Sequence, residues 1–383
     1  MINEKLLIRF SILDGLYWAW NASFCGFITT YMLNCGMDST ALSLVLAAFM
    51  LLSFIGAFFW GGQCDKLRTN RKVFLVAFAV SAILAFVTYF LAGNVLVAAA
   101  LLYPVAGFLI SPLGANIDGW MLRGFHLDAA LYGRARAIGS SGYAVAMLVV
   151  GQVVNRLGFG ALPVCFGILS ILVFILAFTA KESPYGERAR TLKPANPAGL
   201  LKIGPFLFLL AILFFTGLAI SPVNNLKNVL LESVGGDVGT IGIDAFLGVM
   251  LQAFFIFLSG KMARIDKHLR LFLVAFTVFL TMVCVIVAAD PLFIIVGTLF
   301  TNASYGIMLP TMREITEDTV PDELKNTARS LTDAVFGNFA GILALLYSGW
   351  MMDSFGAKSV AWLGLCVMVI PVVMSLMKMR KKN

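Results

Sequence analysis

Long apolar stretches alternate with short polar ones along the whole of this 383-residue chain. Each apolar stretch holds about 20 residues or more, enough for a helix to cross a hydrocarbon core about 30 Å thick. The pattern predicts twelve membrane-spanning helices, at 7–34, 40–62, 72–93, 94–122, 134–157, 159–180, 204–231, 238–260, 269–290, 291–313, 326–352 and 356–378. The longest polar stretch, with three prolines and many charges, separates six of these helices from the other six. We therefore expect an N-terminal six-helix bundle (1–180), a cytoplasmic linker (181–203) and a C-terminal six-helix bundle (204–383).

The two halves share an internal repeat. Residues 62–78 match residues 260–276 at an offset of 198, and both copies end in Phe-Leu-Val-Ala-Phe. Gly62 aligns with Gly260 and Lys66 with Arg264, so the glycine and the basic positions keep their register. A duplicated half predicts an all-α integral membrane fold in which the two bundles are pseudo-symmetric.

Composition agrees with a membrane protein and excludes a water-soluble globule. Hydrophobic residues make up 60% of the chain, charged residues 13%, and the mean hydropathy is +0.92. The net charge of +8 does not indicate nucleic-acid binding, because the basic residues are sorted by side of the membrane. All Lys and Arg residues except Arg156, Lys227 and Lys358 fall on the side of the N-terminus, and basic loops mark the cytoplasmic side. We therefore expect a multi-pass protein of the plasma (inner) membrane with both termini in the cytoplasm.

The residues that enzymes and metal sites need are scarce. The six cysteines are scattered without a C-x-x-C pair, and the two histidines, His126 and His268, lie in predicted loops. A phosphate-cradling loop and an extramembrane domain are also missing from the pattern. The first apolar run lacks a small-residue cleavage site after it, so we expect a retained span rather than a secretory signal. The sequence predicts no enzyme, no cofactor and no metal site.

Two opposite charges bracket the short turn between the fourth and fifth predicted helices. Asp118 and Arg136 lie in otherwise apolar stretches, where a charge costs roughly 2.5–3.5 kcal/mol unless it meets a partner, water or a ligand. Helices joined by a short turn run antiparallel, so these side chains can face each other. A carboxylate and a guanidinium provide charge-assisted hydrogen bonds to sugar hydroxyls, and an aromatic ring such as Tyr143 covers the C–H face of a sugar. The alternative interpretation is a structural ion pair between two closely packed helices.

Other polar groups in the spans extend the candidate site. Trp18 and Asn21 of the first helix offer stacking and hydrogen bonds. Asn225 and Asn302 belong to a group of polar residues in the C-terminal half, together with Asn224, Lys227, Asn228, Gln252, Ser304, Tyr305 and Asn338. A proton carrier in a membrane has to be an acid that can change its charge, and Asp14 and Asp118 are the candidates. The expected partners are a small polar solute, protons and the lipid bilayer.

The loop between the second and third helices, Gly-Gly-Gln-Cys-Asp-Lys-Leu-Arg-Thr-Asn-Arg-Lys at 61–72, resembles the signature loop of the major facilitator superfamily. Arg68 stands where that loop usually has a glycine, and the second copy has Ala263 at the acidic position. The resemblance implies the major facilitator fold, with charged loops that hold one conformation of the transporter shut. The conformational-gate residues implied in this way are Gly61, Asp65, Lys66, Arg71, Lys72, Gly260 and Arg264.

Within that superfamily, Tyr-Gly-Arg-Ala-Arg at 132–136, with Asp118 before it, is similar to the sugar-binding hairpin of the lactose permease-like oligosaccharide:proton symporters. The resemblance implies substrate roles for Asp118, Arg136 and Tyr143. The chain departs from the family in its tenth helix, where Phe300 and Ala303 stand at the proton-handling positions. We expect proton-coupled uptake of a sugar or oligosaccharide by alternating access. The alternatives are a symporter of nucleosides or another small polar solute, an uncoupled facilitator, and a drug:proton antiporter.

Overall fold

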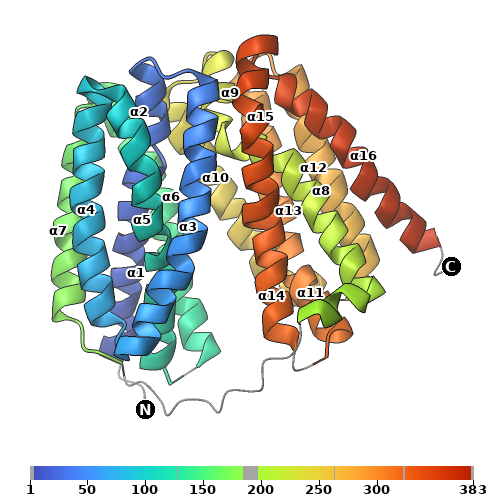
Figure 1. Ribbon diagram of the computed structural model, residues 1–383, viewed down its shortest axis with the longest axis horizontal. Helices are drawn as coiled ribbons and strands as arrows, with labels where there is room; N and C mark the ends of the chain where they lie inside the picture. The colour runs from blue at the N-terminus through green and yellow to red at the C-terminus, as the bar shows by residue number, and fades with distance from the viewer. Residues whose placement is uncertain (1–3, 127, 184–196, 263, 322–323, 381–383) are drawn as a thin grey trace. The chain divides into compact units, whose positions relative to one another are not determined.

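The computed structural model describes residues 4–126, 128–183, 197–262, 264–321 and 324–380, which form helices joined by short turns (Figure 1). The chain divides into two compact units. Unit 1 comprises Met1–Glu187 and Asp237–Val249, and unit 2 comprises Arg188–Gly236 and Met250–Asn383. The change from unit 1 to unit 2 falls in the predicted linker, of which residues 184–196 lie outside the described residues.

Unit 1 is built from α1 to α7 and the first part of α10. The helices are α1 (Glu4–Cys25), α2 (Ile28–Asn34), α3 (Ser39–Leu67), α4 (Arg71–Asn94), α5 (Leu96–Gly124), α6 (Ala129–Leu157), α7 (Ala161–Thr179) and α10 (Val238–Phe257). α1 packs against α6 and α7, and α5 packs against α3 and α4. Glycines make the approach of α3 and α5 possible, because a Cβ atom at Gly56 would lie 2.2 Å from the carbonyl oxygen of Phe108. The first part of α10 belongs to this unit because Gly242 lies against α6, where a Cβ would meet the Met147 carbonyl oxygen at 2.4 Å.

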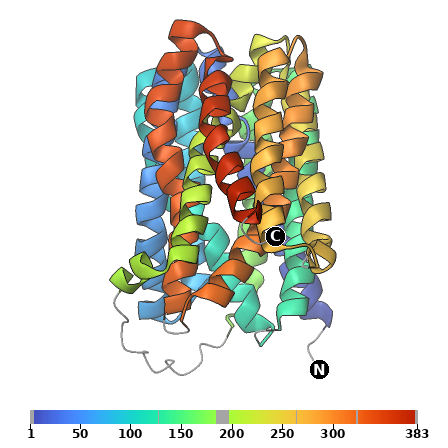
Figure 2. The same cartoon turned by 90° about the vertical axis from the view of Figure 1, so that its right-hand side faces the viewer.

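Unit 2 holds the remaining helices, which Figure 2 shows from a second side. They are η1 (Pro197–Lys202), α8 (Gly204–Asn225), α9 (Lys227–Ser233), α11 (Ser259–Met262), α12 (Lys267–Val287), α13 (Pro291–Thr319), α14 (Lys325–Asp333), the π-helical segment η3 (Ala334–Phe339), α15 (Ala340–Phe355) and α16 (Ser359–Arg380). α12 packs against α13 and α16, and α8 packs against α15 and α16. The core of the unit is a cluster of aliphatic and Met side chains from α8, α12 and α13, including Leu209, Val274 and Met312.

The predicted spans agree with the helices. In the described parts of the chain, eleven helices are long and apolar enough to cross a membrane. The remaining predicted span is the first, 7–34, which corresponds to α1 and α2 together and breaks at Gly26 and Phe27. The seventh span is also in two pieces, and its break lies at Leu226, the C-cap of α8, whereas Pro222 is accommodated inside α8. The eleventh span consists of α14, η3 and α15. The all-α, twelve-span prediction is therefore confirmed, and three spans are interrupted.

Candidate functional site

Arg136 lies near two carboxylates, whereas the sequence predicted a pair with one. Its Nε atom is 3.6 Å from Oδ1 of Asp118, which α5 supplies, as the hairpin pattern predicted. Its Nη1 atom is 3.8 Å from Oδ2 of Asp14, which α1 supplies from far earlier in the chain. All three residues belong to unit 1. The structure thus adds Asp14 to the predicted pair and makes a three-residue charge cluster.

The three charged side chains differ in their exposure. The Asp14 side chain is 0% exposed, whereas those of Asp118 and Arg136 are each 29% exposed. Within the described ranges, neither carboxylate oxygen of Asp14 has a hydrogen-bond partner. Both ion-pair distances exceed hydrogen-bond length, so the attraction is Coulombic and each carboxylate keeps free acceptor positions. Two carboxylates and one guanidinium carry a net charge of −1, which a single proton would neutralise.

Glycines create the space in which Asp14 lies. A Cβ atom on Gly139 of α6 would lie 1.9 Å from Oδ2 of Asp14, far inside van der Waals contact. One turn later on the same helix, a Cβ on Gly142 would lie 2.2 Å from the carbonyl oxygen of Gly15. Small residues at these positions let α1 and α6 approach closely, as is common where membrane helices meet. The position of Asp14 therefore depends on the absence of a side chain at residue 139.

Two aromatic side chains cover one side of the charge cluster. The guanidinium carbon of Arg136 lies 4.4 Å from the ring centroid of Trp18, within the range of a cation–π interaction. Tyr143 meets Trp18 edge to face, with ring centroids 6.4 Å apart and an interplanar angle of 67°. Gly114 of α5 makes room for the indole, because a Cβ there would be 3.2 Å from Cζ2 of Trp18. The predicted residues Trp18, Arg136 and Tyr143 thus form one contiguous group.

α1 contributes its predicted polar residues from a single face. Asp14, Trp18 and Asn21 are four and three residues apart, which places them on one side of a helix. The Asn21 amide makes a long contact to Sγ of Cys25, at 3.9 Å, and no shorter hydrogen bond within the described chain. The spacing of these residues was a signal that could have linked Asp14 to the predicted pair.

The predicted residues of the C-terminal half lie in unit 2 and bond mainly to their own helices. The Asn225 amide donates to the Ser221 carbonyl oxygen at 2.9 Å, and the Asn302 amide donates to the Thr298 carbonyl oxygen at 2.9 Å. Each keeps its amide oxygen for another partner. The structure therefore does not join these two residues to each other.

The first copy of the predicted gate loop forms the end of α3 and the start of α4. Gly61 and Asp65 line a cavity of about 190 Å³ between α3 and α5, together with Asn70, Asn116 and Arg123. Lys66 and Lys72 are exposed. Arg68 takes a left-handed conformation (φ 51°) at the C-cap of α3. Few residues other than glycine adopt this conformation, which explains why related loops carry a glycine there.

Glu182 completes this end of unit 1. It follows α7 and accepts hydrogen bonds from the backbone N–H groups of Asn70, at 3.3 Å, and Arg71, at 3.2 Å. The guanidinium of Arg71 in turn donates to the carbonyl oxygen of Phe178. A carboxylate at the first turn of α4 also interacts favourably with the helix dipole. The predicted gate residue Arg71 is thus fixed by one contact with the last turn of α7 and one with Glu182 after it.

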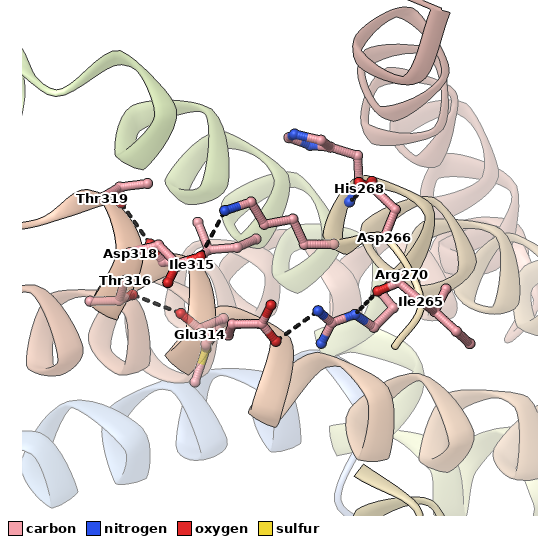
Figure 3. Close-up of polar contacts among 11 residues, drawn as sticks. Ile265, Asp266, His268, Arg270, Glu314, Ile315, Thr316, Asp318 and Thr319 are labelled. Atoms are coloured by element: carbon pink, nitrogen blue, oxygen red, sulfur yellow. Dashed lines mark hydrogen bonds and ion pairs between the residues drawn. The ribbon is translucent and has the colours of Figure 1, made fainter. Parts of the chain in front are cut away.

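The second copy of the gate loop contains a buried arginine that the gate prediction did not include. Arg270 aligns with the exposed Lys72 of the first copy, yet it is only 2% exposed. Figure 3 shows its guanidinium between Glu314, at 2.7 Å, and the carbonyl oxygen of Ile265, at 3.0 Å. The predicted gate residue Arg264 is exposed, and Gly260 lies in α11.

The acids at the end of α13 connect it to its neighbours. Glu314, Glu317 and Asp318 lie on one face at spacings of three and four residues. Asp318 accepts from Lys267 of α12 at 2.8 Å, and Glu317 pairs with Lys325 of α14 at 3.3 Å and with Arg329. This spacing of acids is the sequence signal that could have identified the network.

A family model described as the MFS_1 like family matches residues 7–363 of the chain. The maltose permease of Geobacillus stearothermophilus is 25% identical over 330 residues, which cover 85% of this chain and 82% of that protein. The uncharacterized transporter YwbF of Bacillus subtilis (strain 168) is 24% identical over 324 residues, which cover 80% of this chain and 79% of that protein. The similarity to both relatives therefore extends over most of each chain.

Solved structures of transporters share this fold. A crystal structure of a mutant of the nucleoside transporter NupG matches with a TM-score of 0.85 at 16% identity, and the match covers 97% of this chain and 99% of that one. The structure of a bacterial metal transporter matches with a TM-score of 0.72 at 13% identity, over 98% of each chain. At identities this low, the likeness shows the fold alone.

Proposed function

Because the chain belongs to the MFS_1 like family and has the fold of major facilitator superfamily transporters, we propose that it takes up a sugar or oligosaccharide in symport with protons. The observation that carries this proposal is the charge cluster of Arg136 with Asp14 and Asp118, beside the Trp18 ring. The similarity to a maltose permease supports a sugar as the solute. We place the protein in the plasma membrane with both termini in the cytoplasm, as the sorting of its basic residues predicts.

The three charged residues have different roles in this proposal, because they differ in exposure. Asp118 and Arg136 are partly exposed, so they can accept from and donate to hydroxyl groups of the sugar. Trp18 and Tyr143 present ring faces and edges beside them, which suits the C–H face of a sugar. Substrate contacts from Asn21, Asn225 and Asn302 remain part of the proposal.

Asp14 is the proton carrier in this proposal. It is fully buried, its carboxylate has no hydrogen-bond partner among the described residues, and it faces the arginine that also holds Asp118. A proton taken up by Asp14 neutralises the cluster and weakens its pull on Arg136, which leaves the guanidinium to Asp118 and the sugar. Loss of that proton on the other side of the membrane restores the pair. Binding of the sugar and of the proton are thereby linked through one arginine.

The loops predicted as gates would hold one conformation shut while the site faces the opposite side of the membrane. Asp65, Lys66 and Arg71 lie at the end of α3 and the start of α4, close to the contacts of Glu182 with α4. Salt should weaken such exposed charge contacts, so the balance between conformations should depend on ionic strength.

The test is uptake of radiolabelled maltose into proteoliposomes under an imposed, inwardly directed proton gradient. We expect Asp118→Asn and Arg136→Ala each to weaken maltose binding by about 30-fold, since a hydrogen bond between the sugar and a charged group is worth about 2 kcal/mol. Arg156→Ala, an exposed arginine at the far end of the same helix, is the matched control. Binding that survives both site substitutions refutes the site assignment.

Coupling is tested separately with Asp14→Asn, which mimics the protonated acid. We expect this variant to exchange internal for external maltose and to lose accumulation driven by the proton gradient. Wild-type uptake that ignores the gradient would show an uncoupled facilitator and would exclude the role of Asp14.

A further inference from the structure

Asn224 differs from Asn225 and Asn302, because its amide bonds to another helix rather than to its own. Its amide nitrogen donates across unit 2 to the Tyr305 hydroxyl, at 3.1 Å, and thereby joins α8 to α13. Within the described chain its amide oxygen accepts no hydrogen bond, and the Tyr305 O–H group donates none. Both residues are only partly buried. An unused acceptor and an unused donor therefore lie next to each other inside two membrane-spanning helices.

The Tyr305 ring is held in place by its surroundings. It packs against the aliphatic core of unit 2, and the Phe336 ring meets it edge to face, with centroids 5.4 Å apart and an interplanar angle of 78°. A ring fixed on two sides directs its hydroxyl group to one place. The hydroxyl and the Asn224 amide are thus preorganised, which lowers the entropic cost of binding a ligand.

Phe336, which makes this contact, belongs to the π-helical segment η3. Each residue of an α-helix turns the chain by about 100°, so the wider turn of a π-helix changes which side chains face a neighbour. Gly217 of α8 permits the segment to approach, because a Cβ there would lie 2.8 Å from the Phe336 carbonyl oxygen. A π-helical turn breaks the regular hydrogen-bond pattern of the α-helix, and such turns are frequent at functional sites.

We propose that Asn224, Tyr305 and Phe336 form a second ligand-contacting cluster, which binds adjacent hydroxyl groups on an uncharged ring. This inference rests on the proposed function, namely transport of a polar solute. One hydroxyl of the pair donates to the Asn224 amide oxygen, and its neighbour accepts from the Tyr305 O–H group. The Phe336 ring covers apolar C–H groups of the same ligand. Both a hexose and the ribose of a nucleoside carry such a pair of hydroxyls.

The experiment measures ligand affinity of the purified full-length protein by calorimetry. The probes are maltose, D-glucose and uridine, with 2-deoxyglucose, 3-deoxyglucose and 2′-deoxyuridine as partners that lack one hydroxyl. In the wild type we expect loss of the contacting hydroxyl to weaken binding about tenfold, the size of one good hydrogen bond. Tyr305→Phe should weaken binding of the parent ligand equally and abolish the difference between the parent and that deoxy analogue.

Matched substitutions separate contact from structural damage. Tyr347→Phe removes the same atom from a partly buried tyrosine of α15, and Phe339→Leu shortens a 56% exposed ring in the same π-helical segment. Both should bind as the wild type does, whereas Phe336→Leu should bind about threefold more weakly, for lost ring contact. Asn224→Ala should lose about tenfold.

The outcomes distinguish this inference from the proposed function. In one outcome uridine binds, Tyr305→Phe abolishes its difference from 2′-deoxyuridine, and neither maltose nor glucose binds. This outcome overturns sugar uptake and upholds the cluster. In another outcome a sugar binds, but Tyr305→Phe leaves its difference from every deoxy analogue unchanged. This outcome overturns the cluster and upholds sugar uptake. A wild-type protein that binds none of the probes overturns both.

Discussion

Three glycines of α6 allow a graded test of the close packing that positions Asp14. An added Cβ at Gly139 would lie 1.9 Å from an Asp14 carboxylate oxygen, and ordinary contact begins near 3.4 Å, so the carboxylate has to retreat by about 1.5 Å. At Gly142 the obstacle is the backbone carbonyl of Gly15, which cannot turn away as a side chain can. At Gly133 an added Cβ meets nothing within 4 Å.

The magnitudes follow from these distances. Forcing an extra carbon into a packed interior typically costs about 1–3 kcal/mol, while Gly→Ala in a helix returns up to about 1 kcal/mol of conformational free energy. Gly142→Ala should therefore destabilise most, by about 2–3 kcal/mol, and Gly139→Ala by about 1 kcal/mol. Gly133→Ala should be neutral or stabilising by up to about 1 kcal/mol.

The assay is thermal unfolding of the three purified variants in detergent, with sugar binding measured in parallel. Adding Asp14→Ala to Gly139→Ala should recover part of the lost stability, because the carboxylate is gone while Cδ1 of Trp18, at 2.9 Å, still obstructs the new Cβ. The same addition should have no such effect on Gly142→Ala. Equal shifts for Gly133→Ala and Gly142→Ala would refute the packing argument. A Gly139→Ala penalty that persists in full without the Asp14 carboxylate would refute its assignment to that contact.

Three further outcomes are expected. Arg270→Gln should lower the unfolding midpoint by the equivalent of about 2–3 kcal/mol, because it removes the hydrogen bonds that the buried guanidinium donates to Glu314 and to the Ile265 carbonyl oxygen. Lys72→Gln at the exposed repeat position should change stability by less than about 0.5 kcal/mol. Trp18→Leu should weaken maltose binding about fivefold through the lost cation–π contact, measured against Trp350→Leu at an exposed site. Hydrogen bonds from Thr240 hold the pKa of Asp237 below its usual value. The ionised Asp237 therefore stabilises the folded protein at neutral pH, and this contribution is lost as the pH falls through the lowered pKa. Asp237→Asn should therefore flatten the acid limb of a stability–pH curve, and an unchanged limb would contradict this.

The sequence was most informative where the signal is local. Hydropathy depends on consecutive residues, so the spans were located to within a few residues of the helices. The Asp118 and Arg136 pair could be predicted because one short turn joins α5 to α6 and fixes which faces meet. The breaks inside three spans were less accessible. Polar residues flank Leu226, and Gly337 and Asn338 lie in the π-helical segment, but side-chain polarity does not by itself show where the α-helical hydrogen-bond pattern stops.

The partners from distant parts of the chain could not be predicted in the same way. Asp14 reaches Arg136 only because Gly139 and Gly142 bring α1 against α6. The spacing of Asp14, Trp18 and Asn21 marks one polar face of α1, but it does not show which helix that face meets. The repeat aligned Arg270 with Lys72, but only packing against α13 buries one while the other stays exposed. Asn224, Asn225 and Asn302 have the same chemistry, and their hydrogen bonds alone separate the first from the others.

The membrane-spanning, all-helical class and the hairpin charges could be read from the sequence, because each depends on residues close together along the chain. The repeated halves could be read from it because two segments match residue by residue. Only the folded chain shows the third member of the charge cluster, the buried arginine of the second repeat and the bond between Asn224 and Tyr305. Each of these depends on the rotation of a helix about its axis and on its distance from a neighbour. Those quantities are set by small-residue packing over the whole bundle rather than by local composition.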